Sequence, residues 1–167
     1  MVAMKHMMKK IHVPSTTFLR ISVWGIAAIA AALCIFIGIQ VVREGVSPQY
    51  PMLWGIVITI LLSAIPFFIA LRQALRLLRA IDTGSAFSLF SLQALRRIIH
   101  CAIAIAVLYG AGTPHLFTLA QADDAPGVVL LGLIIIGASV LIALFAAVLH
   151  KLLAQAIAIQ SENELTV

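Results

Sequence analysis

The sequence predicts an all-α integral membrane protein with four antiparallel transmembrane helices. Of its 167 residues, 63% are hydrophobic and 10% are charged, and the mean hydropathy is +1.14. A soluble domain of this length would need far more charge on its surface. Four apolar segments also reach the length of about 20 residues that a hydrocarbon core of roughly 30 Å requires. They are residues 21–42, 52–71, 98–119 and 128–149.

Two of the segments that join the spans are short, which predicts that consecutive spans pack as antiparallel neighbours. Residues 43–51 and 120–127 contain Gly, Pro, Ser and Asp, the residues that form turns. We therefore divide the chain into an N-terminal segment, a bundle and a C-terminal tail. These are residues 1–20, 21–149 and 150–167.

The third joint, residues 72–97, is charged and patterned, and we call it the elbow. Arg72, Arg76 and Arg79 share one face of a helix that leaves the membrane. Residues 82–85, Asp-Thr-Gly-Ser, have the composition of a turn. Ser88 or Ser91 can then cap a new helix that continues into span three.

The distribution of Lys and Arg predicts which side of the membrane the elbow faces. Of the 11 basic residues, four precede span one, five lie in the elbow and one follows span four, so ten gather on one side. Cytoplasmic segments carry such an excess, and we expect both termini and the elbow in the cytoplasm. Anionic lipid headgroups explain the net charge of +5 without direct nucleic-acid binding.

Within the spans, small residues and helix breakers indicate where helices touch or bend. Small residues at every fourth position predict close helix contacts in lipid. Gly110, Gly112 and Pro114 predict a kink or an early end in span three. The candidate contact residues are Ala27 with Ala31, Ala28 with Ala32, and Ser139 with Ala143 and Ala147.

The tail is expected to prolong the last span as an amphipathic cytoplasmic helix. Its apolar positions recur at helical spacing, and its last residues are acidic and lie on the same side as the elbow arginines. We therefore expect Glu162 or Glu164 to pair with one of those arginines. The apolar stripe consists of Leu149, Leu152, Leu153, Ala156 and Ile157.

The sequence contains few residues that would indicate transport, cofactor binding or catalysis. The spans contain no Asp, Glu, Lys or Arg, which counts against a proton-coupled transporter or an ion pump. His100 and His150 lie at similar depth and could hold a haem or a metal ion. We favour two interfacial histidines that reach toward the headgroups. No motif for nucleophilic, zinc or phosphate chemistry is present, and we expect neither an enzyme nor a cofactor.

The specific polar features instead gather at the inner surface, which predicts a folded docking face for a soluble partner. The positive-inside rule explains the number of elbow arginines, but not the turn between them or the acidic tail beside them. The predicted docking residues are Arg72, Arg76, Arg79, Asp82, Gly84, Phe87, Arg96, Arg97, Glu162, Asn163 and Glu164.

These motifs carry a family resemblance. The stretches AIDTGSAFS and LQALRRI in the elbow, with AIAIQSENELTV at the C-terminus, resemble DUF2975, a family of small four-span bacterial membrane proteins. Ala86 stands where the family has proline. The resemblance implies the bacterial inner membrane. It also implies a very small helix-turn-helix regulator as a partner, because members are often encoded beside one.

We therefore expect a regulatory or signalling membrane protein that docks a soluble partner. The alternatives are a small transporter or permeability factor for a hydrophobic or cationic compound, and a b-type haem carrier that uses His100 and His150.

Overall fold

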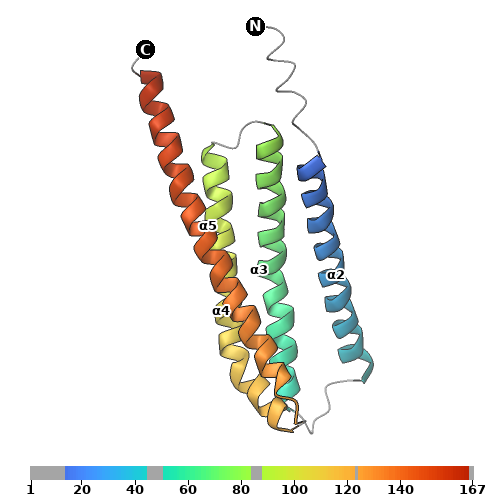
Figure 1. Cartoon of the computed structure of the whole chain (residues 1–167). Coiled ribbons are helices and arrows are strands. Elements are labelled where there is room, and N and C mark those ends of the chain that lie inside the picture. Colours follow the sequence, from blue (N-terminus) through green and yellow to red (C-terminus); the bar gives the residue numbers. More distant parts are fainter. Residues whose placement is uncertain (1–13, 45–50, 84–87, 123, 166–167) are drawn as a thin grey trace.

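The computed structural model describes residues 14–44, 51–83, 88–122 and 124–165, and these residues form four long helices that run up and down (Figure 1). All four are long and apolar enough to cross a membrane, so the predicted all-α architecture with four candidate spans is confirmed. The helices are α2 (Pro14–Glu44), α3 (Pro51–Asp82), α4 (Leu89–Ala122) and α5 (Gly127–Leu165).

Local signals explain where α3 and α4 begin. Helix α3 starts at Pro51. The first residues of a helix donate no hydrogen bond within it, so the N–H that proline lacks is not needed there. The backbone N–H of Ser91 donates to the carbonyl oxygen of Ser88 (3.0 Å) and lies 3.4 Å from its Oγ. Ser88 is therefore the cap of α4, whereas Ser91, the other predicted cap, lies inside the helix.

The last helix continues without a break, and the described residues contain no separate C-terminal element. Its 39 residues span about 58 Å at about 1.5 Å each, nearly twice the thickness of a hydrocarbon core. Its final turns extend beyond the ends of α3 and α4 (Figure 1). In the predicted apolar stripe, Leu153, Ala156 and Ile157 are half-buried, but Leu149 and Leu152 are exposed.

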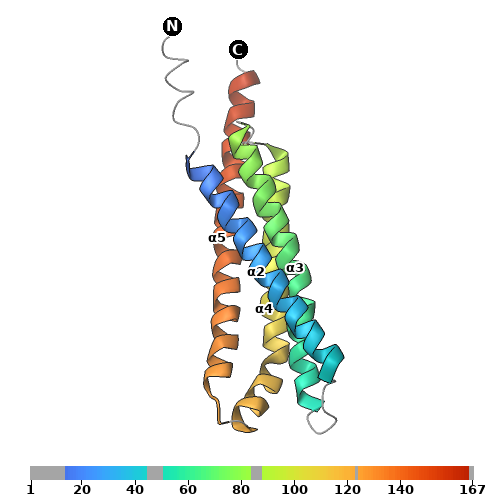
Figure 2. The same cartoon turned by 90° about the vertical axis from the view of Figure 1, so that its right-hand side faces the viewer.

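Helix α4 does not end early at Pro114 but continues to Ala122. The helix turns aside near this end, as Figure 2 shows, because proline cannot donate to the backbone ladder. The next turn contains Asp124 with a φ of 50°, a left-handed conformation that Asp tolerates. Helix α3 also contains a proline, Pro66, which the sequence reading overlooked.

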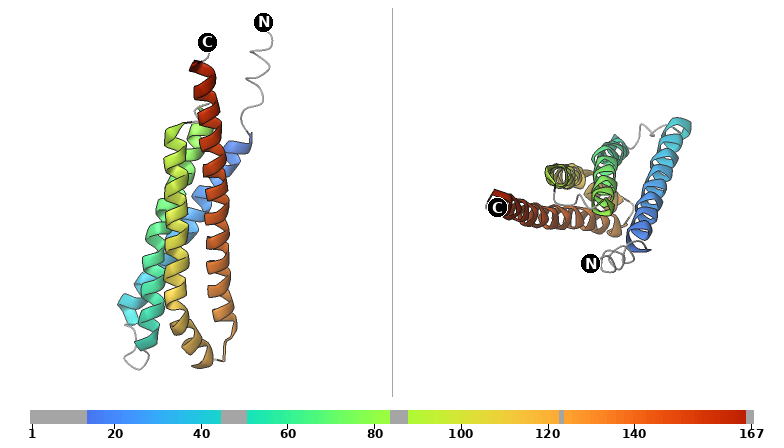
Figure 3. Two further views of the ribbon diagram at one scale, coloured as in Figure 1. Left: turned by 90° about the vertical axis from the view of Figure 1, so that its left-hand side faces the viewer. Right: turned by 90° about the horizontal axis from the view of Figure 1, so that it is seen from above.

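Helices α3, α4 and α5 form the packed part of the bundle, and α2 lies at its edge. Among the described residues, α4 contacts α3 and α5, whereas α2 contacts α3 alone. Seen from above in Figure 3, α3 lies between α2 and α4. No residue between 18 and 43 is buried. Of the predicted α2 contact residues, Ala27 and Ala31 are half-buried, whereas Ala28 and Ala32 are exposed. In α5, Ser139 and Ala143 are buried as predicted, but Ala146 is buried in place of Ala147.

Glycines let the helices approach in the half of the bundle away from the elbow. A Cβ at Gly112 of α4 would lie 2.9 Å from Oγ1 of Thr59 in α3. A Cβ at Gly132 of α5 would lie 2.6 Å from Cδ1 of Leu116 in α4. In lipid, such close backbone contact replaces the hydrophobic effect as the force between helices.

Replacing Gly112 by Ala should destabilise the bundle by about 1–3 kcal/mol, because the new methyl group overpacks the contact with Thr59. Denaturation of the purified protein measures the change. Gly110→Ala is the matched control, since a Cβ there meets nothing within 4 Å and should be neutral or slightly stabilising. Thr59→Ala should rescue the Gly112 variant. Equal effects at the two glycines would contradict this reading of the contact.

Candidate functional site

The elbow arginines lie at one end of the bundle, together with the start of α2 and the end of α5 (Figure 1). Arg72 and Arg79 of α3 are exposed and Arg76 is half-buried. Arg96 and Arg97, on α4, are exposed. The structure thus brings all five arginines of the predicted docking face to the same end.

Beneath these arginines lies the most tightly packed part of the described chain. Ser91 is fully buried, and its Oγ lies 3.3 Å from that of Ser88. Ala94 is 2% exposed. Small side chains on α4 are the least exposed residues of this end. The other buried residues here are Gln73, Leu78, Ala80 and Leu95. The arginines therefore project from a packed layer of buried residues.

A shallow hollow of about 440 Å³ lies between the ends of α3 and α4. Two guanidinium groups and an aromatic ring line it, with no acidic residue among its lining. Arginine's planar fork suits a carboxylate or a phosphate, and the ring offers an apolar contact beside it. The lining residues are Arg76, Arg79, Ala80, Thr83 and Phe90.

The structure also shows an ion pair that sequence reasoning missed. Nη2 of Arg20 in α2 lies 2.6 Å from Oδ2 of Asp82 in α3, with the two side chains 40% and 26% exposed. Asp82, predicted as a docking residue, is thus engaged within the chain. The signal was available, because a base at the start of span one and an acid just after span two lie on the same side in antiparallel neighbours.

The remaining predicted site residues lie at the margins of what the structure describes. Gly84 and Phe87 lie outside the described residues, as do the side chains of Asn163 and Glu164. Glu162 is exposed near the end of α5. Pairing between the tail acids and the elbow arginines therefore stays a prediction.

The two candidate haem or metal ligands differ in their surroundings. His100 is exposed, and its Nδ1 lies 2.7 Å from the carbonyl oxygen of Arg96, to which a ring N–H there would donate. His150 is half-buried. No group of three or more His, Cys, Asp or Glu residues comes together among the described residues.

The fold and its charged end define a multi-span helical membrane protein. A family model described as "Protein of unknown function (DUF2975)" matches residues 43–167, and the chain belongs to this family. It is 45% identical over 157 residues to the "Uncharacterized membrane protein YoaS" of Bacillus subtilis (strain 168). The match covers 92% of this chain and 98% of that protein. No solved structure matches the chain.

The Arg20–Asp82 pair should stabilise the attachment of α2 by about 0.2–1 kcal/mol, the range for partly exposed pairs. A double-mutant cycle on the purified protein measures it: Arg20→Ala and Asp82→Asn should each lose the pair, and the double variant should lose little more than either one. Arg72→Ala serves as the control for the loss of a single charge. Strictly additive effects of the two changes would show that the pair contributes nothing.

Proposed function

We propose that the protein is a regulatory or signalling protein of the bacterial inner membrane, whose cytoplasmic elbow docks a soluble protein with an acidic surface. One observation carries the proposal: five arginines project from a layer of buried residues, and none of them forms an ion pair with a described residue. A positive surface of this kind attracts and orients a partner of opposite charge.

The positive-inside rule alone predicts arginines beside the spans, so the number of arginines does not support the proposal. The support comes from how they are arranged. Membrane insertion requires charge near the helix ends, but it does not require a buried serine and alanine layer beneath the charge. It also does not require Arg76 and Arg79 to border a hollow with Phe90. Both features favour recognition of a particular surface over general attraction to lipid.

The partner would present a carboxylate beside an apolar side chain, to match the guanidinium groups and the ring of the hollow. The family resemblance suggests a small helix-turn-helix regulator as this partner. Residues 150–167 would then act as a cytoplasmic amphipathic extension that contributes Glu162, Asn163 and Glu164 to the same face. Both termini face the cytoplasm in this arrangement.

A small transporter or permeability factor for a hydrophobic compound is the second candidate. The spans lack charged residues, but a cavity of about 280 Å³ lies between α2 and the other helices. In that case the bundle itself would be the active part, and changes to the elbow arginines would leave the activity intact.

Replacing Arg76 and Arg79 by Ala, or Arg96 and Arg97 by Ala, should reduce capture of the soluble partner by about tenfold or more, because fork-shaped donors to its carboxylates are lost. Quantitative mass spectrometry of pull-downs with the tagged full-length protein, from native membranes, measures the capture. The matched control is Arg43→Ala, an exposed arginine at the opposite end of the bundle.

The same variants should change the transcripts controlled by a DNA-binding partner while they insert normally in the membrane. Unchanged capture and unchanged transcripts in both double variants would overturn the docking proposal and leave the transporter as the first candidate.

A further inference from the structure

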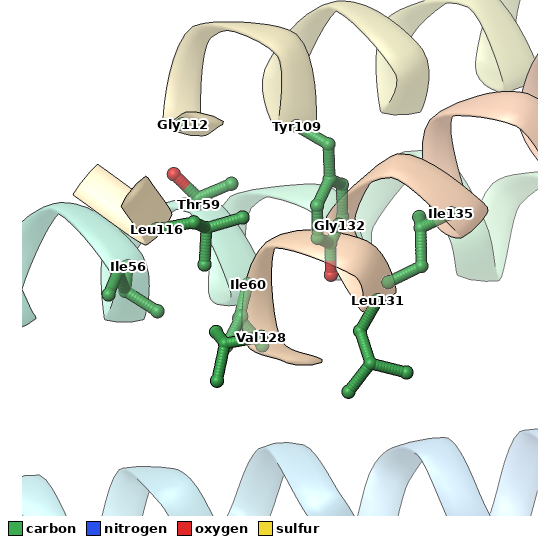
Figure 4. A pocket seen from close by; sticks show the side chains of 10 residues that line it. All are labelled: Ile56, Thr59, Ile60, Tyr109, Gly112, Leu116, Val128, Leu131, Gly132 and Ile135. Carbon is green, nitrogen blue, oxygen red and sulfur yellow. The ribbon is translucent and has the colours of Figure 1, made fainter. Parts of the chain in front are cut away.

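Away from the elbow, three helices border a half-open cavity of about 180 Å³ within the membrane-spanning part of the bundle. Figure 4 shows its lining: Ile56, Thr59 and Ile60 come from α3, and other side chains come from α4 and α5. The walls are aliphatic apart from two hydroxyl groups, on Thr59 and Tyr109, and no charged residue lines the cavity. The lining from α4 and α5 is Tyr109, Gly112, Leu116, Val128, Leu131, Gly132 and Ile135.

The two hydroxyl groups differ in what they offer a bound molecule. The Thr59 hydroxyl donates to the carbonyl oxygen of Gly55 at 2.8 Å, so its proton is already used. The Tyr109 side chain makes no hydrogen bond to any described residue. Tyr109 is half-buried, so its hydroxyl group can donate to an acceptor that enters the cavity.

A second cavity, of about 280 Å³, adjoins the first. Ile60, Tyr109 and Ile135 line both, so the tyrosine ring lies between the two spaces. The wall on the α2 side consists of Ala30, Leu33 and Cys34. Because α2 packs on α3 alone and is nowhere buried between residues 18 and 43, this second cavity gives a route to the bilayer.

We propose that these joined cavities bind an uncharged, lipid-soluble molecule with a ring-sized apolar body and a carbonyl oxygen that accepts a hydrogen bond from the Tyr109 hydroxyl group. Size supports a ring, since a cavity of about 150 Å³ holds benzene in another protein. The aliphatic lining excludes a charged ligand, which nothing there would neutralise. The carbonyl distinguishes such a ligand from a lipid acyl chain, which has no atom that accepts a hydrogen bond from Tyr109. This site is independent of the elbow and of its partner.

Benzophenone is a suitable probe, because it combines a carbonyl with apolar rings and inserts into nearby C–H bonds under ultraviolet light. Full-length protein in lipid nanodiscs would be labelled at increasing probe concentration, and the adducts located by mass spectrometry. We expect saturable labelling on cavity residues such as Ile60, Leu131 and Ile135.

Tyr109→Phe keeps the ring and removes the donor, so it should raise the half-saturating concentration about fivefold. Val128→Phe should fill the cavity and abolish saturable labelling. Ile134→Phe is its matched control, since Ile134 lies outside the cavity lining and is 55% exposed, and it should label as the wild type does.

Thermal denaturation of each variant would show that it remains folded. Labelling that increases linearly with probe on lipid-facing residues would overturn the proposal. So would half-saturation in folded Tyr109→Phe and Val128→Phe that equals the wild-type value.

Discussion

The exclusion of charge from hydrocarbon determines where the charged interactions of this protein lie. The four spans as the sequence defines them contain no Asp, Glu, Lys or Arg, because each would cost several kcal/mol at the bilayer centre. The hydroxyl groups that do occur there mostly donate to their own helix. Ser63, Thr113 and Ser139 each bond a carbonyl oxygen three or four residues earlier. Recognition through charge is therefore left to the ends of the helices.

The two ends of the bundle are built differently as a result. At the elbow, small side chains such as Ser91 and Ala94 close the space between helices, and arginines project from this packed layer. At the other end, Gly112 and Gly132 bring backbones together while the larger side chains around Tyr109 leave cavities. The first arrangement suits a surface that binds a partner, and the second suits a small apolar ligand.

Helix α2 lies at the edge of the bundle and forms one wall of the second cavity. It contacts α3 alone, and the Arg20–Asp82 pair is the ion pair that the structure shows between described residues of α2 and α3. A helix held by lipid-exposed aliphatic contacts and one partly exposed ion pair can move relative to α3 at little cost.

Hydropathy and turn chemistry were sufficient to predict four long apolar helices, the end of α3 near Asp82 and a cap at Ser88. They did not predict Arg20 beside Asp82, the contacts of Gly112 and Gly132, or the cavities. The reason is physical: a span that is apolar on every side carries no periodic signal to show which face meets its neighbour. The rotation of each helix about its axis decides those contacts. For the same reason, the sequence offered two alanine pairs in α2 as contacts, and only Ala27 and Ala31 lie on its half-buried face.

The central claim is that the arginine-rich end faces the cytoplasm, where a soluble partner can reach it. Alkaline phosphatase fused after Ser85 and after Asp124 tests this claim most directly, because the enzyme is active only outside the cytoplasm. The fusion after Asp124 should be active and the fusion after Ser85 inactive. Activity at Ser85 with none at Asp124 would place the elbow outside and contradict the proposed docking face.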